Sequence, residues 1–158
     1  MILLRVCESF AAEAHVPVRG IRGAVRVASN DQGEIFARTR ELLGAMVEAN
    51  RVRPNDVAAA FFTLTPDLDA AFPAAAARAM GWTDVPMMCA SEVAVPGALD
   101  RVVRVLLLVN SRLAPGAVRH QYLGDARCLR PDLATTGERP KRSSRSSSST
   151  TRSAGGKR

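Results

Sequence analysis

The sequence is poor in the residues that ligate metals or form disulfides. It has three cysteines (Cys7, Cys89 and Cys128) with no C-x-x-C pair, and two histidines, His15 and His120. This odd number of cysteines without paired spacing argues against a disulfide framework and against a zinc site. It indicates a reducing compartment, and we expect a cytoplasmic protein without a metal.

Lysine is nearly absent, since only Lys141 and Lys157 occur. Before residue 139 the chain has 15 arginines and 15 acidic residues, so the formal net charge of +7 belongs to residues 139–158. A basic segment outside the domain gives no support for a nucleic-acid-binding fold. A GC-rich coding bias explains the preference for arginine, so the number of arginines does not by itself indicate an anion site.

Neither end of the chain has the composition of a folded or membrane-spanning segment. Residues 1–17 lack a basic start, and Glu8 and Glu13 interrupt their apolar stretch, unlike a signal peptide or a transmembrane helix. Residues 136–158 are rich in Ser and Arg and have no large apolar side chain to offset the entropy of ordering. We expect an N-terminal extension over 1–17, one domain over 18–135, and a disordered basic tail over 136–158.

The apolar pattern between these ends predicts seven elements in the order β-α-β-α-β-β-β. Asp31 and Glu34 have the spacing of a helix capping box, and Ile35, Leu42 and Met46 follow at helical spacing. The predicted strands cover 16–27, 57–65, 85–90, 102–109 and 121–129, and the predicted helices cover about 31–50 and 72–80. This order favours an α+β fold, a single domain with a mixed sheet and helices on one face.

Arg104 interrupts the most apolar run of the chain, residues 102–109, which is typical of a buried strand. Burial of an unpaired guanidinium costs at least several kcal/mol, so Arg104 needs a partner, a ligand or water. The alternative is an edge-strand arginine whose side chain reaches solvent.

Four segments in order resemble one family: RGIRGA (19–24), TPDLDAAFPAAAAR (65–78), the C-x-x-E of Cys89 to Glu92 with Arg104, and RHQYL…LRPDL (119–133). They resemble the small trimeric chorismate mutases of the pseudo-α/β-barrel class, the AroH class. The resemblance implies a homotrimer with active sites between subunits. It also implies a cofactor-free rearrangement of chorismate to prephenate, on the route to phenylalanine and tyrosine.

The resemblance also implies roles for individual residues. Arg104 would bind the ether oxygen and a carboxylate, Glu92 would accept a hydrogen bond from the ring hydroxyl, and Arg22 would bind a carboxylate. The implied substrate-binding residues are Tyr122 beside Arg22, Cys89 in the pocket, Phe72 and Arg78 from the neighbouring subunit, and Leu129 and Arg130 at the mouth. Ala75 departs from the family, which often has a basic residue there, so Arg78 and Arg130 are candidates for the missing contact.

The rearrangement needs no nucleophile or general base, and the sequence offers no convincing one. It needs a folded substrate and a fixed cation where negative charge grows, which a planar guanidinium supplies. Purely structural alternatives stay open for these residues. Glu92 could be a solvated carboxylate, Arg22 could pair with an acid across the sheet, and Arg78 could simply be exposed. Tyr122 and Phe72 could belong to a core, and Cys89 could be a small buried side chain. Two other functions stay open, a trimeric reactive-imine hydrolase and a non-catalytic module that binds small anions.

Overall fold

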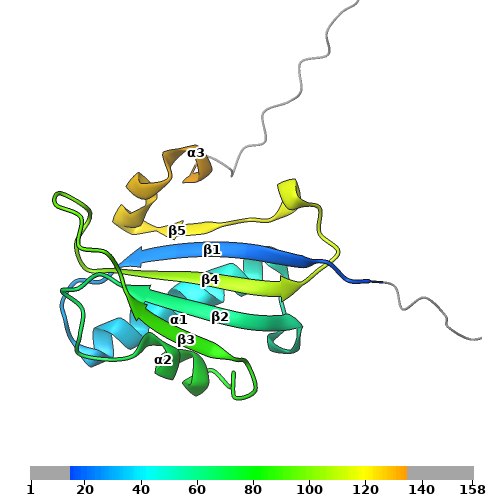
Figure 1. Cartoon of the computed structure of the whole chain (residues 1–158), viewed down its shortest axis with the longest axis horizontal. Coiled ribbons are helices and arrows are strands. Elements are labelled where there is room, and N and C mark those ends of the chain that lie inside the picture. The colour runs from blue at the N-terminus through cyan, green and yellow to red at the C-terminus, as the bar shows by residue number, and fades with distance from the viewer. Residues whose placement is uncertain (1–14, 135–158) are drawn as a thin grey trace, which may run out of the picture.

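A mixed sheet of five strands is the centre of the fold in the computed structural model, which describes residues 15–134 (Figure 1). The strands are β1 (Val18–Arg26), β2 (Val57–Leu64), β3 (Met87–Ser91), β4 (Val102–Asn110) and β5 (Gln121–Leu123), in the order β3-β2-β4-β1-β5. Strand β4 is antiparallel to both β1 and β2, whereas β5 is parallel to β1 and β3 is parallel to β2. The predicted fold class is confirmed.

Strand β4 is the middle strand of this sheet, which explains its apolar run. Val103, Val105 and Leu107 are buried on the side where the helices pack, and strands pair with β4 along both edges. Arg104 therefore belongs to a central strand, and the alternative of an edge-strand arginine is wrong.

Two helices, α1 (Gln32–Asn50) and α2 (Pro73–Ala79), cover one face of the sheet (Figure 1). Helix α1 begins as predicted, because the Asp31 carboxylate accepts a hydrogen bond from the backbone N–H of Glu34 over 3.0 Å. It ends at Arg51, which adopts the left-handed conformation at φ 52° and donates its N–H to the last turn. The buried side of α1 includes Ile35, Leu42, Leu43 and Met46, so the predicted apolar stripe faces the main core.

The opposite face of the sheet, hereafter the uncovered face, is not covered by α1 or α2. Side chains alternate along a strand, so this face receives Arg22 and Ala24 from β1 and Arg104 and Leu106 from β4. It also receives three side chains of β2 and β3, namely Phe61, Thr63 and Met88. Leu106 and Phe61 are each 36% exposed and Met88 is 61% exposed, so this face is partly apolar and open.

The predicted last strand, 121–129, is wrong beyond residue 123. Gly124 adopts a positive φ of 53°, and the chain continues as the 3-10 helix η3 (Gly124–Leu129) and the short helix α3 (Pro131–Ala134). The turn at Gly124 takes the chain off the edge of β1, and Ala126 becomes fully buried against Ala24 and Val102. Two further 3-10 helices, η1 (Pro54–Asp56) and η2 (Pro115–Ala117), complete the secondary structure of residues 15–134.

The predicted extension over 1–17 and tail over 136–158 lie almost entirely outside the described residues and stay predictions. Within residues 15–134 no helix has both the length and the apolar character needed to cross a membrane.

Candidate active site

The strand register brings one residue of each strand into a single row on the uncovered face. Arg104 of β4 lies opposite Ala24 of β1 and opposite Thr63 of β2. Tyr122 of β5 continues the row beyond Ala24, and Ala90 of β3 continues it beyond Thr63. Because Ala24 is small, the side chains of Arg104 and Tyr122 face each other across it.

Glu92 is the partner of Arg104. It directly follows β3 and is anchored there by a hydrogen bond from its backbone N–H to the carbonyl of Leu64, over 2.9 Å. Its carboxylate forms an ion pair with Nη1 of Arg104 and accepts a hydrogen bond from the Thr63 hydroxyl over 2.5 Å. The Glu92 side chain is only 15% exposed, so the ion pair is partly shielded from solvent.

Arg104 keeps most of its donor groups for a ligand. Among residues 15–134 the structure shows one hydrogen bond of its guanidinium, from Nη1 to Glu92, whereas a guanidinium has five N–H groups. Its side chain is 33% exposed. Burial lowers the pKa of Arg104 and Tyr122 acts in the opposite direction, but an arginine remains charged at neutral pH.

A second cationic group lies around Tyr122 and the start of β5. Arg22 is exposed on the uncovered face, and its backbone N–H donates to Nδ1 of His120 over 3.0 Å. Burial lowers the pKa of His120, and the charges of Arg22 and Arg130 lower it further. Arg130 forms two hydrogen bonds with Asp132, of 2.8 and 2.6 Å, which raise the pKa of Arg130. Arg104 and Arg130 both interact electrostatically with Tyr122, and Arg22 lies beside His120, an arrangement suited to an anion with two carboxylates.

The structure does not bring every predicted site residue to this face. Cys89 lies opposite the buried Phe62, and its side chain packs against the main core on the helix side, as its structural alternative predicts. Phe72, the N-cap of α2, is 71% exposed, and Arg78 is exposed on the same helix, which packs on the other side of the sheet. Leu129 is half-buried against Ala24, Val102 and Ala126.

Sequence reasoning did not single out Thr63 and His120. Thr63 interrupts the apolar run of β2 in the same way as Arg104 interrupts that of β4. This interruption was the signal in the sequence that could have identified Thr63. His120 lies two residues before Tyr122, so it follows the β period toward the same face. In residues 15–134 no group of three or more His, Cys, Asp or Glu side chains could hold a metal ion.

Arginines, one half-buried carboxylate and a tyrosine lie on one sheet face, an arrangement suited to a small dianion. Residues 18–133 match the family model described as chorismate mutase type I. The chain therefore belongs to this family of isomerases, the AroH class, whose reaction serves aromatic amino-acid biosynthesis.

Curated relatives and a solved structure agree with this assignment. The chain is 51% identical over 117 residues to chorismate mutase AroH of Thermus thermophilus, covering 73% of this chain and 96% of the relative. It is 41% identical over 120 residues to the Bacillus subtilis enzyme of the same name, covering 75% and 94%. A chorismate mutase structure from Clostridium thermocellum superposes with a TM-score of 0.69 at 45% identity, covering 70% of this chain and 98% of that one.

Proposed function

We propose that this chorismate mutase converts chorismate to prephenate on the uncovered face, with Arg104 at the ether oxygen and Glu92 at the adjacent ring hydroxyl. The observation that carries the proposal is the Arg104–Glu92 ion pair, braced by Thr63 and partly open to solvent. Such a pair fixes a cation and an anion before substrate arrives, so neither has to reorient during the reaction.

The rearrangement breaks the ether C–O bond and forms a C–C bond within one molecule, with no proton transferred and no atom gained or lost. Negative charge grows on the ether oxygen, where the free N–H groups of Arg104 stabilise it more in the transition state than in the ground state. Arg22, Arg130 and Tyr122 bind the carboxylates and hold the folded conformer. Glu92 accepts the hydrogen bond of the ring hydroxyl.

The working form of the enzyme that we propose is a homotrimer with shared active sites. The exposed apolar side chains of the uncovered face, Phe61, Met88 and Leu106, favour contact with a neighbouring chain. Phe72 and Arg78 lie on the helix side of their own sheet, so they would contribute to a neighbour's site rather than to their own. We further propose a cytoplasmic enzyme that needs no cofactor, nucleic acid or membrane, and a fold bounded by residues 18 and 135.

The activity is tested by monitoring the loss of chorismate through its ultraviolet absorbance and then identifying prephenate as the product. We expect turnover by the purified full-length chain, loss of turnover in Arg104→Ala, and wild-type rates in Arg53→Ala, which removes an exposed arginine at the opposite end of β2. A wild-type chain that binds chorismate without converting it would instead support the anion-binding module, and hydrolysis of imines would support the hydrolase.

Mixing two inactive variants tests the shared sites. If Arg104 and Arg78 come from different subunits, mixed trimers of Arg104→Ala and Arg78→Ala chains contain some intact sites. Random assembly at equal ratio would restore roughly a quarter of the wild-type sites, because each site needs the right chain at two positions. The mixed trimers are isolated through an affinity tag on one variant that co-purifies the other. If they recover no turnover, Arg78 would belong to the same site as Arg104 in one chain or to none.

A further inference from the structure

Two segments meet above one end of the uncovered face, and both are close to the site. The first is the connection from β3 to β4, residues 92–101, which begins with Glu92. The second is η3, which leads from Tyr122 to Leu129 and Arg130. They share a small apolar cluster whose fully buried members are Ala24, Val102 and Ala126, with Leu99, Tyr122 and Leu129 partly buried around it. Such small side chains bury little area, so apolar packing alone holds these segments weakly.

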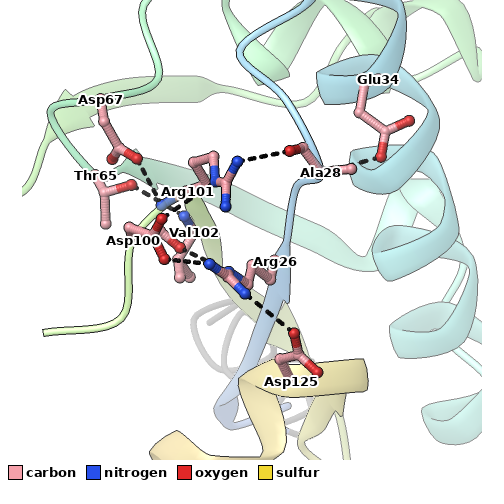
Figure 2. Close-up of polar contacts among 9 residues, drawn as sticks. All are labelled: Arg26, Ala28, Glu34, Thr65, Asp67, Asp100, Arg101, Val102 and Asp125. Carbon is pink, nitrogen blue, oxygen red and sulfur yellow. Dashed lines mark hydrogen bonds and ion pairs between the residues drawn. The ribbon is translucent and has the colours of Figure 1, made fainter.

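Arg26 connects the two segments. It is the last residue of β1, lies opposite Val102, and follows Arg22 and Ala24 on the uncovered face. Its Nη2 binds the Asp100 carboxylate over 2.5 Å, and its Nε donates to the Asp100 carbonyl over 3.4 Å. Its Nη1 binds the Asp125 carboxylate of η3 over 3.3 Å. Figure 2 shows the guanidinium of Arg26 between these two carboxylates, one from each segment.

The backbone around Asp100 is fixed by a second set of contacts. Arg101 adopts a positive φ of 51°, which is uncommon for a residue with a side chain. Its backbone N–H donates to the Asp67 carboxylate over 2.8 Å, and its Nη1 donates to the carbonyl of Ala28, also over 2.8 Å (Figure 2). These contacts hold the turn in which the Asp100 carboxylate faces Arg26. The hydrogen bond from Arg26 lowers the pKa of Asp100, so the carboxylate is charged at neutral pH.

We propose that Arg26 is a positioning residue, which holds the 92–101 and 124–130 segments in the arrangement that binds substrate by joining Asp100 to Asp125. It does not touch the reacting atoms. It acts through the two segments that carry Glu92 on one side and Leu129 with Arg130 on the other. The proposal rests on the proposed function, because it assigns a role in substrate binding at that site.

The two ion pairs of Arg26, with Asp100 and with Asp125, are hereafter the clamp. Loss of the clamp should affect the binding of substrate more than the chemical step. Asp100 and Asp125 are 53% and 71% exposed, so these ion pairs contribute little to global stability. Without them the two segments lose the link between them, although Arg101 still holds the turn at Asp100. Both segments then sample more conformations around that turn, and substrate binding has to order them again. In the bound state Arg104, Glu92 and Thr63 keep their own contacts, so the chemical step is little changed.

The test compares Arg26→Met, Arg26→Lys and Asp125→Asn in the full-length enzyme. For Arg26→Met we expect KM for chorismate to rise about three- to tenfold while kcat stays within about twofold. Lysine reaches one carboxylate but lacks the fork that binds both, so its KM should be intermediate. Asp125→Asn keeps the shape of an exposed side chain and removes the charge of one of the two ion pairs, so its KM should also rise, by less than in Arg26→Met and without a folding defect.

The split between KM and kcat separates a positioning role from a merely structural one, and hydrogen exchange shows which segments are affected. In Arg26→Met the amides of 92–101 and 124–130 should exchange faster in the free enzyme, while those of α1 are unchanged. The matched control is Arg53→Met, which removes the exposed Arg53–Asp56 ion pair at the other end of the sheet and should change neither KM nor these amides.

Three outcomes would overturn the proposal: unchanged KM and unchanged exchange in both segments, a uniform rise in exchange over the whole fold, or a loss confined to kcat. Wild-type turnover of chorismate is measured first, and its absence would overturn the proposed function alone. The exchange comparison still tests the clamp in that case, because it does not depend on substrate.

Discussion

The backbone N–H of Arg22 donates a hydrogen bond to Nδ1 of His120, and this contact requires that nitrogen to be unprotonated. The neutral ring then carries its proton on Nε2. Since burial and the charges of Arg22 and Arg130 lower the pKa of His120, the contact is complete at neutral pH. It joins the start of β5 to the arginine that we assign to a substrate carboxylate.

Acidification should therefore weaken the fold through His120. Its pKa is lower in the folded chain than in the unfolded one, so this contribution to stability is present above the usual pKa of about 6.5 and is lost as the pH falls through the folded value. His120→Asn, whose side-chain oxygen can accept the same hydrogen bond, should flatten this part of the curve of melting temperature against pH. A curve identical to wild type below pH 6.5 would contradict the assignment. Turnover itself should be nearly flat from neutral to alkaline pH, because no proton is transferred.

Gly23→Ala should destabilise the fold, because an added Cβ would lie 2.5 Å from Sδ of Met46 and 2.9 Å from Cδ1 of Leu42. Both side chains are fully buried, so they have to repack or α1 has to move away from the sheet, at a cost of about 1–3 kcal/mol. Gly44→Ala is the matched control: nothing lies within 4 Å of its added Cβ, and alanine favours a helix interior by up to about 1 kcal/mol. Thermal unfolding should show shifts of opposite sign, and equal shifts would contradict the close approach of α1 at Gly23.

Much of the fold could be predicted because its elements have clear local signals. The capped helix of residues 32–50, the apolar run of β4 and the order of the elements follow from periodicity and capping residues within each segment. The end of β5 could not be predicted, because Gly124 and the cluster around Ala126 depend on contact with β1 and β4, which are distant in sequence.

The sequence motifs indicated candidate site residues but not the face of the sheet on which each side chain lies. Motif matches indicated Arg104 and Glu92, and the structure joins them. The side on which Cys89 lies depends on the register of β3 against β2, which pairs it with the buried Phe62. The partnership of Thr63 with Glu92 depends on the same register, and no local pattern encodes it.

Thr63→Val should reduce catalysis without unfolding the protein. The substitution keeps the shape but removes the hydrogen bond to the Glu92 carboxylate, leaving a mostly buried charge with one partner fewer, a loss of about 1–3 kcal/mol. We expect kcat/KM to fall about two- to tenfold if roughly half of that loss reaches the transition state. Thr63→Ser retains the hydroxyl and should stay close to wild type. Equal kinetics for the valine and serine variants would show that the hydroxyl does not position Glu92.

Removal of both chain ends should leave the enzyme active. Neither residues 1–15 nor residues 139–158 include a proposed site residue, so a chain of residues 16–138 should keep turnover within a few-fold of the full chain. Matched steady-state kinetics and light scattering check this. A large loss of turnover in a folded trimer would mean that one end contributes to the site.

Arg104 is the position at which charge and shape can be separated. Arg104→Ala removes both and should lower turnover by about a thousandfold or more, since one preorganised donor at a developing oxyanion contributes about 10²–10³. Arg104→Lys should recover little, because a single ammonium cannot bind Glu92, the ether oxygen and a carboxylate together. Citrulline at position 104 keeps the planar shape and most donors but is neutral.

We expect the citrulline enzyme to retain moderate binding of chorismate and to lose most of its turnover. Hydrogen bonds hold the ground state, whereas the positive charge acts mainly on the oxygen that becomes negative as the C–O bond breaks. The diagnostic result is a large fall in kcat with a modest change in KM, measured beside Arg53→Ala as a control for charge loss at the surface. If the citrulline enzyme turned over at a near-normal rate, electrostatic stabilisation would not be the source of catalysis, and selection of the folded conformer by Arg22, Tyr122 and Arg130 would have to supply it.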